Sequence, residues 1–89
     1  MQQKELATCL RALGNERRMR AVRELATSPP LTVEAIARRI KLSYKSTARH
    51  MAVLERCGIV ERARVSLEVY YRVNRQHPVL RFTLAQCKA

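Results

Sequence analysis

The chain has 89 residues and a mass of 10.3 kDa, and 18 Lys and Arg against 7 Asp and Glu give it a formal net charge of +11. A chain of this length forms one domain with a modest core, so we expect a single domain over residues 1–89. The sequence contains no Asp and only two Gly, which excludes a paired-Asp active site and a Gly-rich phosphate loop. It shows neither an apolar stretch of membrane-spanning length nor a signal peptide, so we expect no membrane partner.

The excess of positive charge points to a polyanionic partner, with nucleic acid ahead of an anionic membrane. An arginine-rich surface without a partner is the alternative that composition leaves open. The three cysteines are odd in number and show no CxxC spacing, which argues against a disulfide framework and a closed zinc site. Such cysteine usage suits a reducing compartment, so we expect a cytoplasmic protein.

Two amphipathic helices are predicted at the start of the chain. Three leucines at helical spacing predict a helix over Gln3–Leu13, with Gly14 at its end. Asn15 is placed to cap the second helix, which Pro29 and Pro30 terminate. The apolar stripes are Leu6, Leu10 and Leu13 in the first helix and Met19, Val22 and Leu25 in the second.

A helix-turn-helix pattern follows. Thr32 caps a short third helix, and about three residues after that helix ends, Ser43 caps a fourth that runs over Ser43–Cys57 and stops at Gly58. Two capped helices with so short a connection are typical of this motif. The inward positions are Val33, Ile36, Ala37 and Ile40 in the third helix and Thr47, Met51 and Leu54 in the fourth.

The apolar period then changes from helical to alternating. Residues 69–73 predict a strand, and Ile59–Arg64 predicts its antiparallel partner, with a turn of undetermined type near Val65–Leu67. His77 and Pro78 open a last helix, with Leu80, Leu84 and Cys87 along one side. The predicted fold is mainly α with a β-hairpin, in the order α-α-α-α-β-β-α, which is a winged helix-turn-helix.

The fourth helix carries the candidate recognition residues on the face opposite its apolar stripe. Long donors such as Lys45 and Arg49 can reach into the major groove of DNA, and Arg49 can bond to both acceptors on a guanine edge. Hydroxyls near the helix N-terminus suit phosphate. The alternative is an ordinary solvated face, because any amphipathic surface helix shows charges outward. The candidate DNA contacts in this helix are Ser43, Tyr44, Lys45, Ser46, Ala48, Arg49 and His50.

The hairpin adds Arg62, Arg64 and Arg72, which on a wing would touch the backbone or the minor groove of the flanking DNA. These arginines alternate with apolar residues, so a solvated sheet face is the alternative. Leu67 at the presumed tip is a poor phosphate contact, and a neighbouring chain could cover it.

The segments ALGNERRMRAV, LTVEAIARRIKLSYKSTARHMAVLERCGIVERA and VYYRVN resemble the arsenic-repressor (ArsR) type of winged helix-turn-helix regulators, from Leu10 to Asn74. The resemblance implies a homodimer built from the first and last helices, which binds a twofold-symmetric operator and usually represses. By position in the family motif, the base-contacting residues are Tyr44, Lys45, Ala48 and Arg49.

The chain departs from the family pattern at its metal-sensing sites. The third helix has no Cys-x-Cys arrangement, and in the last-helix site only His77 matches a ligand position, with Arg75 and Lys88 standing where the family has Asp and His. We therefore expect no metal and no other cofactor, and His77 is interpreted as a helix-start residue. An effector, if there is one, is not predicted.

Cys9 and Cys87 lie on the two helices that the resemblance assigns to the dimer interface. One hypothesis is a redox switch that joins them, and the other is that both are small apolar fillers. Cys57 is interpreted as packing at a helix end.

The predicted function is a non-enzymatic, homodimeric repressor that reads an inverted-repeat operator in double-stranded DNA. One alternative is a winged-helix assembly module with only non-specific nucleic-acid affinity. Another is an RNA or single-strand binder, for which only Tyr44 and Tyr70 are candidate stacking residues. The sequence shows no nucleophile–base pair or cofactor motif for an enzyme.

Overall fold

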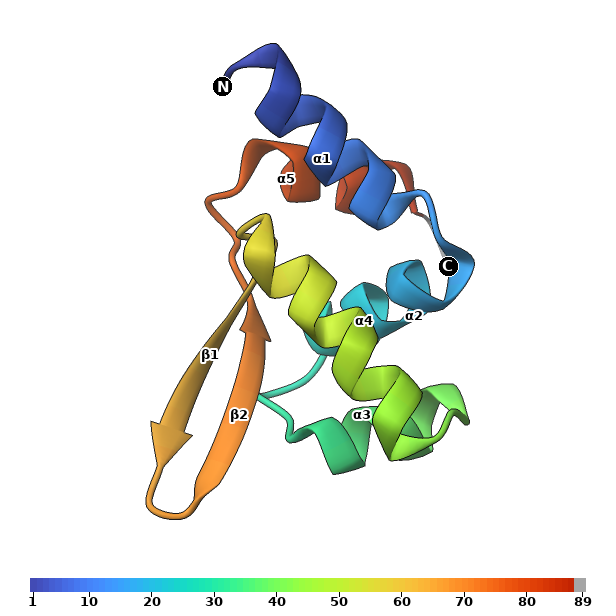
Figure 1. The fold of residues 1–89 in the computed structure, drawn as a ribbon, viewed down its shortest axis with the longest axis vertical. Helices are drawn as coiled ribbons and strands as arrows, with labels where there is room; N and C mark the ends of the chain where they lie inside the picture. Colours follow the sequence, from blue (N-terminus) through green and yellow to red (C-terminus); the bar gives the residue numbers. More distant parts are fainter. Residues whose placement is uncertain (88–89) are drawn as a thin grey trace.

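The computed structural model describes residues 1–87, so Lys88 lies outside the described part of the chain. Its order of elements confirms the predicted winged helix-turn-helix, five helices and a two-stranded hairpin (Figure 1). The elements are α1 (Gln3–Leu13), α2 (Glu16–Ala26), α3 (Val33–Ile40), α4 (Tyr44–Arg56), β1 (Val60–Val65), β2 (Glu68–Val73) and α5 (Pro78–Gln86).

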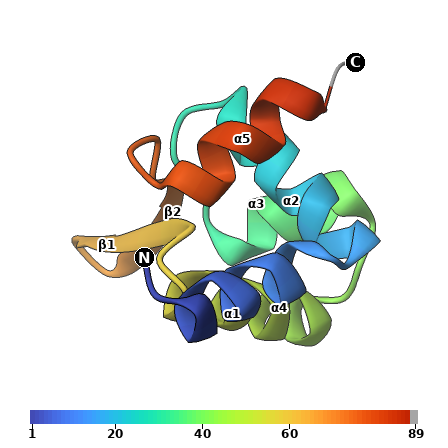
Figure 2. The ribbon, with the colours of Figure 1, turned by 90° about the horizontal axis from the view of Figure 1, so that it is seen from above.

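The molecule has two ends of different character. Figure 1 shows α1 and α5 together at one end of the long axis, while the tip of the hairpin and the N-terminus of α4 lie toward the other. Seen from above, α1 and α5 form the near layer and the remaining helices lie behind them (Figure 2). The N-terminus of α4 and the tip of the hairpin are therefore remote from the two terminal helices.

The predicted helix caps are confirmed. The side chains of Asn15, Thr32 and Ser43 accept backbone N–H bonds three residues ahead, at 3.0, 3.2 and 3.1 Å. Nδ1 of His77 accepts the N–H of Val79 at 3.2 Å, and Pro78 occupies the first helical position, where a missing N–H costs nothing. His77 is therefore a cap, as predicted.

The turn of the helix-turn-helix is formed by a left-handed residue and a backbone hydrogen bond. Lys41 takes the left-handed conformation (φ 59°), and the N–H of Leu42 reaches back to the carbonyl of Ala37 at 3.0 Å. This is the Schellman arrangement, usually made by Gly. It ends α3 and lets Ser43 start α4 directly afterwards.

The inward face of α4 packs into the centre of the core. The predicted side chains Thr47, Met51 and Leu54 are all fully buried. They belong to one core to which every helix and both strands contribute. This packing fixes the rotation of α4, so that its opposite face points outward.

The first helix buries a different face from the one that its leucines suggest. Leu6 is 40% exposed and Leu10 is 53% exposed, whereas Cys9 and Ala12 are buried together with Leu13. Small side chains on the inner face let α1 approach its neighbours closely. Of the predicted stripe, only Leu13 faces the core, and the other two leucines point outward.

β1 is shifted by one residue from its predicted range, β2 begins one residue earlier than predicted, and the hairpin is joined to the helical layer. Its register pairs Val60 with Val73 and Val65 with Glu68, around a two-residue turn in which Ser66 has a φ of 60°. A further bridge, which was not predicted, pairs Leu31 with Tyr71 through N–H···O bonds of 3.0 and 2.7 Å. This bridge anchors β2 to the segment that precedes the helix-turn-helix.

Candidate nucleic-acid interface

The outer face of α4 presents the predicted pattern of long donors and small side chains. Lys45 and Arg49 are exposed, as are Tyr44 and Ala52, and Ala48 lies half-buried between them. The structure thus brings the cationic and small residues to one side of the helix. A helix with this face can approach a groove closely and project donors into it.

The two serine hydroxyls at the start of α4 are less available for phosphate than the sequence suggested. Ser43 is exposed, but its Oγ accepts the N–H of Ser46 as the helix cap. The side chain of Ser46 is half-buried. The free backbone N–H groups of this first turn remain a place where phosphate can bind.

His50 lies at the edge of the outer face and is held by a residue that sequence reasoning missed. Nε of Arg18, in α2, donates to Nδ1 of His50 at 3.2 Å. Since Nδ1 accepts this bond, the ring proton is on Nε2. Burial, then the charges of Arg18 and Arg17, lowers the pKa of His50 below its usual value, so the ring is neutral near pH 7.

The three candidate arginines of the hairpin divide between its two faces. Arg62 lies opposite the buried Tyr71 in the register, and Arg64 shares that face because it is two residues further along β1. Arg72 lies opposite Glu61 on the other face, and its Nε forms an ion pair with Glu61 at 3.3 Å.

Arg62 is also paired, but with α4. Its Nε lies 3.1 Å from Oε2 of Glu55, which ties the base of the hairpin to α4. Arg64 is exposed and forms no ion pair within residues 1–87. Beyond it, the apolar tip residue Leu67 is 91% exposed.

Within one chain, Cys9 and Cys87 lie toward different ends of α5. The Cys9 thiol lies 3.5 Å from Nε2 of His77, whereas Cys87 stands after the nine residues of α5 and contacts Met19. Nine helical residues separate their ends by roughly 13 Å, so Cys9 and Cys87 do not pair within one protomer.

No group of three or more His, Cys, Asp and Glu side chains among the described residues is placed to hold a metal ion. The same part of the chain contains no helix with the length and apolar character needed to cross a membrane.

Comparison with known proteins agrees with the fold. The solution structure of the homodimeric winged helix-turn-helix DNA-binding domain Mb0332 from Mycobacterium bovis, a possible ArsR-family regulator, is 28% identical, with a TM-score of 0.83 over 92% of this chain and 74% of that one. An ArsR-like transcriptional regulator from Rhodococcus sp. RHA1 is 30% identical, with a TM-score of 0.78 and the same coverage of both chains. NolR from Sinorhizobium fredii, at 22% identity and a TM-score of 0.82, covers 92% of this chain and 79% of its own and shares the fold.

These similarities confirm the predicted resemblance to ArsR-like regulators. The comparison with curated proteins found no match. A family model, described as the MarR family, matches residues 15–66, which run from the cap of α2 through the helix-turn-helix to the turn of the hairpin. More than half of the sequence is thus covered, and the chain belongs to the MarR family.

Proposed function

We propose that the protein is a sequence-specific transcriptional regulator that binds double-stranded DNA as a homodimer. The observation that carries this proposal is the outward face of α4, where Lys45 and Arg49 are exposed while Thr47, Met51 and Leu54 hold the opposite face in the core. A net charge of +11 supplies long-range attraction to DNA. The solved relatives described as DNA-binding or ArsR-like regulators support the same function.

In this function α4 lies in the major groove. Arg49 reads a base edge, Lys45 contacts a base or phosphate, and Ala48 lets the helix approach. The DNA backbone or the edge of the groove is contacted by Tyr44, by the first turn of α4 and by the Nε2–H of His50. The hydrogen bond from the N–H of Ser46 to Ser43 Oγ caps that turn. On the wing, Arg64 reaches the flanking phosphates most readily because it has no carboxylate partner among residues 1–87, while Arg62 and Arg72 are held by glutamates.

The terminal helices form the dimer in this proposal. Leu6 and Leu10 on α1 and Phe82 on α5 are exposed, and Phe82 is 65% so. Both helices lie at the end of the molecule that is remote from the wing tip (Figure 1). Burial against a second copy removes this apolar surface from water and leaves both α4 helices free.

A twofold dimer reads an inverted repeat, whose half-sites are about one helical turn, 10 to 10.5 base pairs, apart. Binding over a promoter then represses by occlusion, and the cytoplasm is the compartment in which we expect this to occur.

Selection of bound sequences from a pool of random duplexes tests the proposal directly. We expect an inverted-repeat consensus at moderate salt. A matched pair of variants, Arg49→Ala and Arg23→Ala, removes one exposed positive charge each, from α4 and from α2 respectively. Only Arg49→Ala should change the consensus. Recovery of random sequence by the unmodified protein would instead show a non-specific binder or an assembly module.

A further inference from the structure

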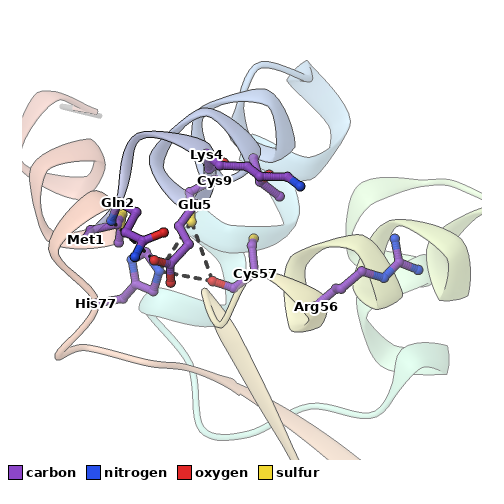
Figure 3. A pocket seen from close by; sticks show the side chains of 9 residues that line it. Met1, Gln2, Lys4, Glu5, Cys9, Arg56, Cys57 and His77 are labelled. Carbon is purple, nitrogen blue, oxygen red and sulfur yellow. Dashed lines mark hydrogen bonds between the residues drawn. The ribbon is translucent and has the colours of Figure 1, made fainter.

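Two thiols from distant parts of the chain lie over the last turn of α4. Cys9 Sγ, from α1, donates to the carbonyl of Cys57 at 3.5 Å, and Cys57 Sγ donates to the carbonyl of Leu54 at 3.4 Å. Both sulfur atoms are therefore held by carbonyls of the same helix end. The close-up in Figure 3 shows Cys9 and Cys57 side by side on the wall of one pocket.

The two cysteines differ in their access to solvent. Cys9 is only 3% exposed, and Cys57 is half-buried. Burial, followed by the neighbouring Cys57 side chain, raises the pKa of the Cys9 thiol above its ordinary value. Cys57 is thus the more accessible of the two thiols. Cys9 is buried beside it and stays protonated near pH 7.

A pocket opens onto this pair. It has a volume of about 430 Å³ and is lined by Cys9, Cys57 and His77 at its inner end, with Lys4, Glu5 and Arg56 around it (Figure 3). The pocket is large enough for a small oxidant. Among the described residues, these three are not placed to hold a metal ion.

His77 connects the start of α5 to both cysteines. Its Nδ1 is occupied by the N–H of Val79, so the ring proton is on Nε2, which donates to the carbonyl of Cys57 at 3.0 Å. Nε2 also lies 3.5 Å from Cys9 Sγ. The start of α5, the middle of α1 and the end of α4 meet at this point.

We propose that Cys9 and Cys57 are an oxidisable dithiol pair that a hydroperoxide converts to an intramolecular disulfide. The Cys57 thiolate attacks the terminal peroxide oxygen, the O–O bond breaks, and an alcohol or water leaves with one proton, which gives a sulfenic acid on Cys57. The sulfur of Cys9 then attacks the Cys57 sulfur. The S–S bond forms, and the hydroxyl group leaves as water with the Cys9 proton, so two thiols supply the two electrons.

The disulfide ties α1 to the end of α4, next to Gly58 and the start of the wing. Both thiol hydrogen bonds to the α4 carbonyls are lost, and the last turn of α4 shifts toward α1. If the protein binds DNA as proposed above, this links the oxidation state of the pair to the placement of α4 and the wing. This regulatory step rests on the proposed function, whereas the disulfide chemistry does not.

Peroxide treatment of the full chain carrying Cys87→Ser tests the pair, because only Cys9 and Cys57 then remain. After exposure to hydrogen peroxide, alkylation under denaturing conditions and tryptic digestion, we expect a mass loss of 2 Da and a link between peptides 5–11 and 57–62. Thiols that stay alkylatable, a Cys57 that gains oxygen without a link, or a link between two chains would each overturn the proposal. Cys57→Ser serves as the control that cannot form the link.

DNA affinity provides the second readout. The linked Cys87→Ser protein should bind its selected site at least about fivefold differently from the reduced protein, and a thiol reductant should restore the original affinity. Equal affinity of the linked and reduced forms overturns the regulatory step. Failure of the reduced protein to bind any duplex counts against the proposed function itself, while the mass measurement still decides the disulfide.

Discussion

Nε of Arg18 donates a hydrogen bond to Nδ1 of His50 across 3.2 Å, and the same guanidinium donates through Nη1 to the carbonyl of Ala12 at 3.2 Å. One side chain of α2 thus connects the end of α1 to the middle of α4. The contact requires a neutral His50, since a protonated ring has no acceptor at Nδ1. Protonation of His50 therefore removes one of the contacts that join α4 to α2.

The first prediction follows from the lowered pKa of His50. The folded state holds this proton more weakly than the unfolded chain, whose histidine titrates near pH 6.5. The unfolded state therefore binds more protons as the pH falls below about 6.5, and the free energy of unfolding decreases. We expect urea midpoints to fall between pH 7.5 and pH 5.0, and to fall less in His50→Gln, which keeps an acceptor for Arg18 without titrating. Equal pH dependence in the two proteins would contradict the role of His50.

The second prediction concerns the buried hydroxyl of Thr47. Its Oγ1 has no hydrogen-bond partner among the described residues, although the side chain is fully buried. Replacing it by the similarly branched valine in Thr47→Val removes this desolvation cost, so the free energy of unfolding should rise by about 1 kcal/mol. Urea denaturation measures the change.

Thr83 provides the matched control. It is also buried, but its hydroxyl donates to the carbonyl of Val79 at 2.8 Å, so Thr83→Val loses a bond and should not gain stability. A gain in both variants would show that valine is favoured for its apolar surface alone.

The third prediction separates base reading from phosphate contact on α4. Arg49→Ala should cost about 1–3 kcal/mol on the selected DNA and flatten the preference at one base position. Lys45→Ala should lower the salt dependence of binding by about one unit of slope, because one phosphate contact is lost. Fluorescence anisotropy titrations over a range of salt measure both. An equal loss for Arg49→Ala on random DNA would reassign Arg49 to the backbone.

The fourth prediction tests the dimer surface at the terminal helices. Phe82→Glu places a charge on exposed apolar surface of α5 and should raise the dimer dissociation constant roughly 10- to 100-fold, since burial of such a side chain contributes about 1.5–3 kcal/mol. Leu67→Glu makes the same kind of change at the wing tip and should leave the dimer intact. Sedimentation equilibrium distinguishes them. If only Leu67→Glu dissociates the dimer, the interface lies at the wing.

The sequence predicted those features that depend on neighbouring residues. Caps such as Asn15 and Thr32, the inward stripe of α4 and the alternation of β2 all follow from spacing within a few residues. The exposed face of α4 could be predicted for the same reason, because the buried stripe determines which side chains point to solvent.

The sequence did not predict the features that depend on residues far apart in the chain. Periodicity alone placed Leu6 and Leu10 in the stripe of α1 and could not show that the smaller Cys9 and Ala12 face the core instead. The Leu31–Tyr71 bridge, the Arg18–His50 bond and the approach of Cys9 to Cys57 join residues 32 or more positions apart. Such contacts are set by how the helices pack, and no local pattern signals them.

The Glu55–Arg62 ion pair places a carboxylate of α4 against the base of the wing. A DNA phosphate that binds Arg62 has to displace the Glu55 carboxylate, which then lies unpaired beside the DNA. Replacing one anion by the other therefore adds little binding free energy. Arg64, two residues further out, faces no such competition within residues 1–87. In the proposed complex we therefore expect phosphate contact at the outer half of the hairpin, while the Arg62–Glu55 ion pair holds the inner half against α4.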